Sequence, residues 1–149
     1  MEYNFKKVHT GKDLTISTIV LLAGIGLFFV NKGLGLCVAI CGLAMFLIYK
    51  GGYKIDGQGI LLQKKSKELC KCCKPSIAEY LNGKDVTPQI KEGNEGGSVR
   101  LDVYYNAASG IAFAQLYDFC NYAFEPITGV IEIHSPKADK LISQLQPRN

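Results

Sequence analysis

Two apolar runs without a charged residue, 14–30 and 34–49, occupy the first third of this 149-residue chain. Asn31, Lys32 and Gly33 separate them. A helix needs about 20 residues to cross the hydrocarbon core of a bilayer, and about 17 is the lower limit. We therefore expect residues 14–49 to form a membrane α-helical hairpin of two spans, with the bilayer as a partner.

Lysines flank this hairpin on both sides and are scarce in its turn. Those near its ends are Lys6, Lys7 and Lys12 before it, and Lys50, Lys54, Lys64 and Lys65 after it. Lys32 alone lies between the runs. The positive-inside rule then predicts a multi-pass protein with both termini cytoplasmic, residues 1–13 being a cytosolic N-terminal segment. We expect the membrane to be the cell inner membrane.

Two alternatives apply to the apolar runs. The first run resembles a signal peptide, but no small-residue cleavage site follows Val30 and a second apolar run begins almost at once. A buried soluble hairpin is the other alternative, but the remaining chain is too short to cover two helices that are apolar on every face.

The second run places small residues on one helix face, at Gly35, Ala39 and Gly42. Small residues let helices approach closely in lipid, where packing drives association. This face can serve packing within the hairpin or self-assembly, and we expect a homo-oligomer because one hairpin is too small to form a pore. No Asp, Glu, Arg or His lies inside either run, which argues against a transporter.

Residues 50–149 are predicted to form a small cytosolic α+β domain with a mostly antiparallel sheet and a C-terminal helix. Short strands at 53–56 and 60–63 are expected to pair as a hairpin. One helix is predicted to open near Ser66, and another at Pro75 that closes at Asn82 and Gly83. Residues 83–98, rich in Gly, Asn, Lys and Glu, are expected to be a mobile loop.

The second half of this domain has a strongly β pattern. Alternation of apolar and polar residues predicts a first strand over 99–105 and its partner over 111–118. Shorter strands are predicted at 122–124 and 130–133. A last helix follows Ser135 and Pro136, with one apolar face made of Ala138, Leu141, Ile142 and Leu145.

A dense cluster of cations suggests a binding site. Five lysines lie within eleven residues, opposed by Glu68: Lys64, Lys65, Lys67, Lys71 and Lys74. Such a cluster can be a solvated face, a contact with anionic lipid headgroups, or a pocket for a phosphate-bearing ligand. We take these five residues and Arg100 as candidate ligand-binding residues. The net charge of +4 is too small to suggest a DNA or RNA duplex as partner.

Three cysteines crowd together at Cys70, Cys72 and Cys73. Neighbours so close pair poorly as disulfides, and free thiols indicate a reducing compartment, in agreement with a cytosolic domain. Their lysine neighbours favour the reactive thiolate, so a thiol redox sensor is an open alternative. A metal sensor would need a fourth ligand, for which Cys120 and His134 are the candidates.

No motif for catalysis emerges from the sequence. The glycines at 93, 96 and 97 lack the lysine and hydroxyl of a phosphate-binding loop, and His9 and His134 form no recognisable triad. We therefore expect a protein that is not an enzyme and that uses no cofactor or catalytic metal.

The plan of a two-span hairpin followed by a small cytosolic domain resembles small bacterial membrane effectors of nucleotide-signalled antiviral defence. A strand followed by a C-terminal helix is similar to pleckstrin-homology-like modules. The first resemblance implies a cyclic nucleotide as ligand and action through the spans. The leading hypothesis is thus a membrane sensor or effector that binds an anionic signalling nucleotide. The alternatives are a membrane-anchored protein-interaction scaffold and a thiol or metal sensor at the three cysteines.

Overall fold

The computed structural model describes residues 3–57, 59–91 and 98–145. The chain divides into two compact units. The hairpin unit is Phe5–Gly59, and the α+β unit comprises Met1–Asn4 and Ile60–Asn149. Each unit is described by itself.

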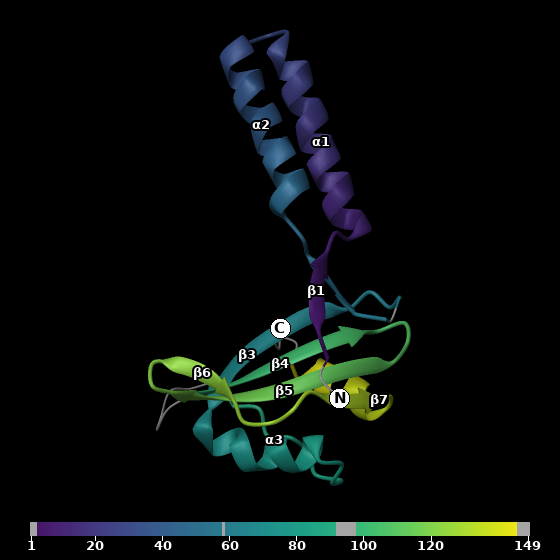
Figure 1. The fold of residues 1–149 in the computed structure, drawn as a ribbon, viewed down its shortest axis with the longest axis vertical. Helices are drawn as coiled ribbons and strands as arrows, with labels where there is room; N and C mark the ends of the chain where they lie inside the picture. Colours follow the sequence, from purple (N-terminus) through teal and green to yellow (C-terminus); the bar gives the residue numbers. More distant parts are fainter. Residues whose placement is uncertain (1–2, 58, 92–97, 146–149) are drawn as a thin grey trace. The chain divides into compact units, whose positions relative to one another are not determined.

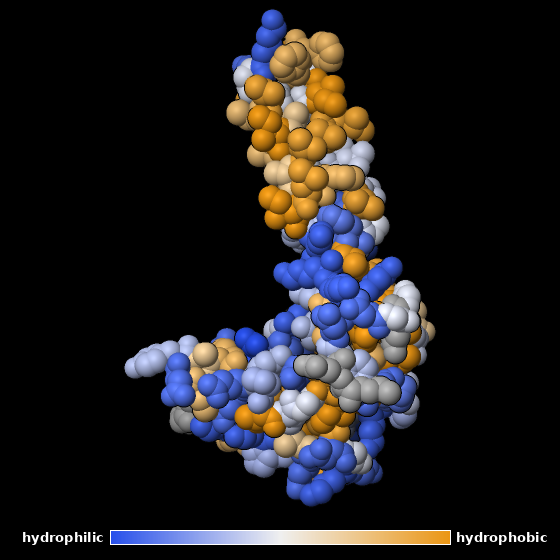
Figure 2. Space-filling model, in the orientation of Figure 1, coloured by the Kyte–Doolittle hydropathy of each residue, from blue (hydrophilic) through white to orange (hydrophobic). Residues whose placement is uncertain are grey.

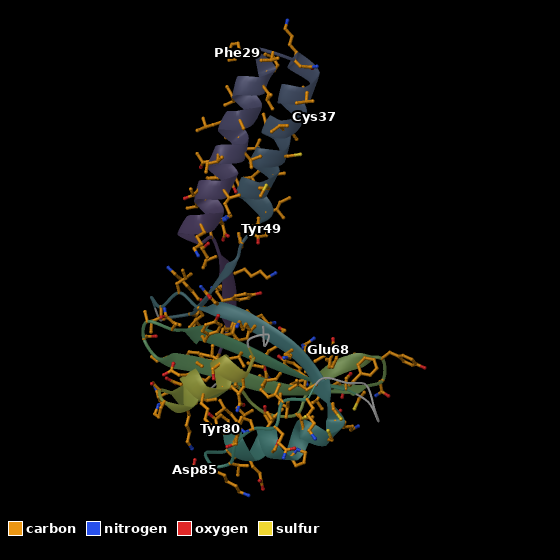
Figure 3. All side chains as sticks on the ribbon, turned by 180° about the vertical axis from the view of Figure 1, so that it is seen from behind. Phe29, Cys37, Tyr49, Glu68, Tyr80 and Asp85 are labelled. Atoms are coloured by element: carbon orange, nitrogen blue, oxygen red, sulfur yellow. The ribbon has the colours of Figure 1, made fainter. Side chains whose placement is uncertain are left out.

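The hairpin unit contains two helices, α1 (Gly11–Phe28) and α2 (Lys32–Ile48), which pack along each other (Figure 1). Among the described residues, α1 is the one helix long and apolar enough to cross a membrane, whereas α2 is as apolar but has 17 residues. Apolar side chains cover the visible face of both helices, and hydrophilic ones gather at the turn and at the opposite end (Figure 2). Phe29 and Tyr49 mark these two ends in Figure 3.

Short polar side chains start both helices. The Thr10 hydroxyl accepts a hydrogen bond from the Asp13 amide at 3.2 Å, and the Asp13 carboxylate accepts one from the Thr10 amide at 2.8 Å. This reciprocal pair is a capping box that satisfies two otherwise unpaired N–H groups. Asn31 caps α2 through its side-chain oxygen, which accepts from the Leu34 amide at 3.2 Å.

Glycines set the close approach of the two helices. A Cβ atom added at Gly24 would lie 2.6 Å from the Cα of Ala39, and one at Gly42 would lie 2.6 Å from the amide nitrogen of Leu21. One at Gly35 would collide with the backbone of Phe28. Of the two uses open for the small-residue face, the structure therefore shows packing within the hairpin.

Strands close the other end of the hairpin unit. β1 (Phe5–Val8) pairs antiparallel with β2 (Gly52–Ile55), so that Phe5 faces Ile55 and Val8 faces Gly52. The expected pairing of 53–56 with 60–63 is therefore wrong. The helical hairpin brings the chain entering α1 beside the chain leaving α2, and Asp13 joins them by accepting from the Gly51 amide at 2.8 Å.

The α+β unit is built on a five-stranded antiparallel sheet in the described part of the chain, with neighbours in the order β3–β4–β5–β6. Its strands are β3 (Gln63–Cys70), β4 (Ser98–Asn106), β5 (Ile111–Cys120), β6 (Ala123–Pro126) and β7 (Ile131–His134). β6 pairs with the last residues of β5, and β7 pairs with its first residues.

Two helices cover one face of this sheet. They are α3 (Lys74–Leu81), which follows the short 3-10 turn η1 (Lys71–Cys73), and α4 (Lys137–Gln144). Val99, Leu101 and Val103 of β4 are fully buried against Ile77 and Leu141 of these helices. The hydroxyl of Tyr80, labelled in Figure 3, donates to the backbone oxygen of Lys137 at 2.6 Å and so ties α3 to the start of α4.

Most of the expected elements of the α+β unit are present. The α+β class, the mostly antiparallel sheet and the C-terminal helix are confirmed, and Ala138, Leu141 and Leu145 of the expected apolar face are buried. Pro75 lies in the first turn of α3, and Gly83 follows the helix at a φ of +89°, a conformation that favours glycine.

Two elements differ. The strand expected at 60–63 is not formed as such, because β3 begins at Gln63, and the helix expected from Ser66 is the second half of β3. A helix this short gains little by itself, whereas the eight-residue strand pairs with β4 from Ser98 to Tyr105. Of the expected loop 83–98, residues 83–91 contain no helix or strand, and 92–97 lie outside the described residues.

Candidate functional site

The sheet face opposite α3 and α4 carries a set of polar and aromatic side chains. Residues that face each other on antiparallel strands share one side of the sheet. The pairing of β3, β4 and β5 therefore places these residues together, on the side away from Leu101 and Val103: Lys64, Ser66, Glu68, Arg100, Asp102, Tyr104, Phe113, Gln115 and Tyr117. This set is called the open-face cluster below.

A buried carboxylate lies at the centre of the open-face cluster. The Asp102 side chain is 2% exposed, with the Lys64 ammonium 2.8 Å from Oδ2 and the Arg100 Nε 3.1 Å from Oδ1. Among the described residues, Oδ1 and Nε find no aligned hydrogen bond, so their contact is an ion pair alone. A buried charge requires such partners, and here two cations share one carboxylate. Glu68 of β3 is exposed and faces Arg100 on the same side of the sheet.

Aromatic rings fix both cations in place. The Arg100 guanidinium carbon is 4.5 Å from the ring centre of Tyr117 and 4.7 Å from that of Phe124. The Lys64 ammonium is 5.1 Å from the ring centre of Tyr104. Cation–π contacts of this kind contribute about 0.5–1 kcal/mol each at exposed sites, and they restrict the rotamers of long side chains. The positive charge of the cluster is thus held in a defined position.

The electrostatics of the cluster favour a charged Lys64. Burial by itself lowers the pKa of Lys64, but the hydrogen bonds to Asp102 and Tyr104 and the negative charge of Asp102 outweigh it, so that the pKa is raised overall. Burial raises the pKa of the Tyr117 phenol as well, and the charge of Asp102 adds to this effect. At neutral pH the cluster therefore presents charged Lys64 and Arg100 beside a neutral phenol.

A second ion-pair cluster lies where α3 begins. Asp118 of β5 accepts a hydrogen bond from the Lys74 ammonium at 2.6 Å, and the Lys71 ammonium lies 3.5 Å from its other oxygen. The hydrogen bond from Lys74 lowers the pKa of Asp118, which overcomes the opposing effect of burial, and the charges of Lys74 and Lys71 lower it further. These contacts fasten the start of α3 to the sheet.

The six predicted binding residues do not form one site. Lys64 and Arg100 meet at Asp102, whereas Lys71 and Lys74 meet at Asp118. Lys65 and Lys67 face Val103 and Leu101, on the sheet side that the helices cover. The Lys65 ammonium lies 5.9 Å from the ring centre of Tyr105.

The acidic partners were not among the predicted residues. The alternation of residues 99–105 already placed Arg100 and Asp102 on one strand face, and that pattern could have identified this pair. Asp118 could not be identified in this way, because it is 44 residues from Lys74 in the sequence.

The three clustered cysteines have different environments. Cys73 is fully buried in the core, where its sulfur accepts a hydrogen bond from the Lys91 amide at 3.4 Å. Cys72 is exposed and Cys70 is half-buried, and the sulfurs of Cys72 and Cys73 are 3.9 Å apart. The described part of the chain contains no group of three His, Cys, Asp or Glu side chains placed to hold a metal ion.

Comparison of the chain with models of protein families, with curated proteins and with solved structures found no match.

Proposed function

We propose that this chain is a small integral membrane protein of the cell inner membrane, whose α1 and α2 cross the bilayer as a two-span hairpin with both termini in the cytoplasm. At about 1.5 Å per residue, helices of 18 and 17 residues extend roughly 27 and 26 Å, close to the thickness of a hydrocarbon core. Large apolar side chains are exposed along both helices, such as Ile19, Leu22 and Leu47. A continuous apolar surface of this kind is typical of contact with lipid.

We further propose that the α+β unit is a sensor that binds an anionic ligand at the open-face cluster. The observation that carries this proposal is the pair of cations on Asp102, because a single carboxylate contacts both the Lys64 ammonium and the Arg100 guanidinium. Arg100 is already held between Tyr117 and Phe124, so little conformational entropy is lost when an anion binds. A guanidinium presents paired N–H groups that suit a phosphate.

The layout of the chain favours a cyclic nucleotide as this anion, and binding would act through several copies of the hairpin. The small-residue face of α2 is used against α1, so contacts between copies would involve the outer faces of the helices. The event is one of binding and assembly and requires no catalytic step.

Thermal unfolding of the full-length protein in detergent micelles tests the sensor proposal. The probes are cyclic mononucleotides and cyclic dinucleotides, with inorganic phosphate as a reference. A ligand at 100 times its Kd stabilises the folded state by about 2.7 kcal/mol. For a domain of this size the melting temperature should rise by roughly 10–20 °C.

Matched variants assign the binding to the open-face cluster. Arg100→Gln and Lys64→Gln should each reduce the affinity of the stabilising nucleotide at least tenfold in calorimetric titration. Lys84→Gln removes the same charge from an exposed pair with Glu79 and should leave the affinity unchanged. The sensor proposal fails if no nucleotide raises the melting temperature, or if all three variants bind alike.

An interaction scaffold is the second candidate, and the turn between β5 and β6 favours it. Tyr122 is 98% exposed at this turn, and Phe119 and Ile127 nearby are partly exposed. Aromatic residues are enriched at the centres of protein interfaces. A scaffold predicts no stabilisation by nucleotides, together with loss of a crosslinked protein partner in the variant Tyr122→Ser.

A further inference from the structure

A cavity of about 430 Å³ lies in the hairpin unit at the end of α2. Six residues from β1, α2 and the chain after α2 line it, namely Lys7, Ala44, Met45, Ile48, Tyr49 and Lys50. Its volume falls in the range of small-molecule sites, which are about 300–1,000 Å³. The lining thus combines apolar side chains of α2 with the two ammonium groups of Lys7 and Lys50.

The two lysines of this cavity have no acidic partner in the part of the chain that the structure describes. Lys6, by contrast, lies 2.9 Å from the Asp56 carboxylate. Lys6 and Lys7 are consecutive residues of β1 and therefore point to opposite sides of the strand. Asp56 thus neutralises Lys6, and Lys7 stays available to a negatively charged partner together with Lys50.

The apolar lining continues into the surface that would face lipid. Ile48 lines the cavity and is largely exposed, as is its neighbour Leu47. Tyr49 marks the end of α2, and tyrosines and lysines at the end of a span typically lie at the level of the lipid headgroups. A ligand for this cavity therefore has an apolar part beside α2 and an anionic part beside the lysines.

We infer that the cavity binds one anionic phospholipid of the cytosolic leaflet, with its phosphate between Lys7 and Lys50 and its first acyl methylenes against Ala44 and Ile48. The inference rests on the proposed two-span insertion and is independent of the ligand proposed for Arg100. Zwitterionic lipids match the apolar lining equally well, so selectivity comes from the two cations. At about 1 kcal/mol per lysine, the expected preference for an anionic lipid is about 30-fold.

Native mass spectrometry of the full-length protein tests this site. The protein is released from micelles that contain equal amounts of phosphatidylglycerol and phosphatidylcholine. We expect one retained phosphatidylglycerol per chain, with a roughly fivefold loss of preference in each of Lys7→Gln and Lys50→Gln. The control Lys54→Gln removes the same charge from β2, outside the cavity, and should retain the lipid. Ala44→Leu fills the cavity without changing its charge and should release the lipid.

The possible outcomes separate this site from the span on which it rests. If the chain inserts into lipid nanodiscs but retains both lipids equally, the proposed lipid site is refuted and the two-span proposal is not. The same holds if the double variant Lys7→Gln/Lys50→Gln keeps the wild-type preference. The arginine versions of these two lysines keep the charge and should keep the preference, which guards against a general loss of folding. A chain that stays in the aqueous fraction without detergent overturns the two-span proposal and the site together.

Discussion

Replacing Gly24 by alanine is expected to separate the two helices of the hairpin unit. An added Cβ would lie 2.6 Å from the Cα of Ala39 and 2.9 Å from its Cβ, whereas ordinary contacts begin near 3.4 Å. The atoms it meets belong largely to the backbone of α2, so no side-chain rotation can make room. The helices would have to move apart by about 1 Å.

The size of the effect follows from the packing lost. A gap of 0.5–1 Å removes about a quarter to a half of the dispersion attraction between facing atoms. Inserting a methyl group into a well-packed contact typically costs about 1–3 kcal/mol. Alanine recovers up to about 1 kcal/mol because it favours a helix more than glycine does. The net destabilisation should therefore be about 1–2 kcal/mol.

Gly26 offers a matched control two residues along the same helix, because a Cβ added there meets no atom within 4 Å. Gly26→Ala should be neutral or slightly stabilising, so the two variants should differ by about 1–3 kcal/mol. The assay is titration of the full-length protein in dodecylmaltoside micelles with sodium dodecyl sulfate, followed by helical ellipticity at 222 nm. Equal midpoints for Gly24→Ala and Gly26→Ala would refute the proposed role of the small-residue contact.

Three further predictions concern the α+β unit. Because Lys74 lowers the pKa of Asp118 below its ordinary value of 3.8, their pairing stabilises the fold above about pH 4, and this stabilisation is lost as the pH falls through the lowered value. Melting temperatures of the wild type should thus fall more steeply between roughly pH 5 and 2 than those of Asp118→Asn, and parallel curves would contradict the pairing. Tyr122 has a φ of +62° and an exposed side chain, so Tyr122→Gly should raise the free energy of unfolding by up to about 1 kcal/mol; a lower denaturant midpoint would argue against the strained turn. Cys73→Ser should destabilise by about 1–3 kcal/mol because it buries a hydroxyl in the core, whereas Cys72→Ser on the surface should stay within about 0.5 kcal/mol; denaturant titrations that place both variants together would contradict this difference.

The elements that the sequence predicts well are those with a strong local pattern. The apolar run 14–30 requires no knowledge of the rest of the chain, and α1 occupies nearly the same residues. The strand 111–118 and the apolar face of α4 are likewise encoded by spacing within a few residues, at a period of two for the strand and about 3.6 for the helix.

Local sequence patterns do not predict which strands pair when the two strands are far apart in the sequence. Phe5 meets Ile55 because the helical hairpin between them, Gly11 to Ile48, returns the chain to its starting point. The sequence of β3 predicts a helix over part of the strand because Leu69 is the one fully buried apolar residue of this edge strand, so apolar and polar residues do not alternate along it. Edge strands often carry lysines, which limit association through their unpaired backbone groups, and those lysines hide the strand pattern.

The same limit applies to the candidate site, because a run of cations in a sequence does not reveal which of them are neutralised. Asp102 and Asp118 come from strands that lie beside the basic segment in space, and each carboxylate takes up two cations. The basic run in the sequence is therefore divided between two carboxylates and does not form one site. In the hairpin unit, by contrast, no carboxylate among the described residues forms an ion pair with Lys7 or Lys50. The sequence alone draws less attention to these two lysines, because lysines are less dense around them than in residues 64–74. Anionic lipid headgroups should therefore be attracted to Lys7 and Lys50 of the hairpin unit. A small anion should bind in the α+β unit, where the Arg100 guanidinium is already fixed by Tyr117 and Phe124.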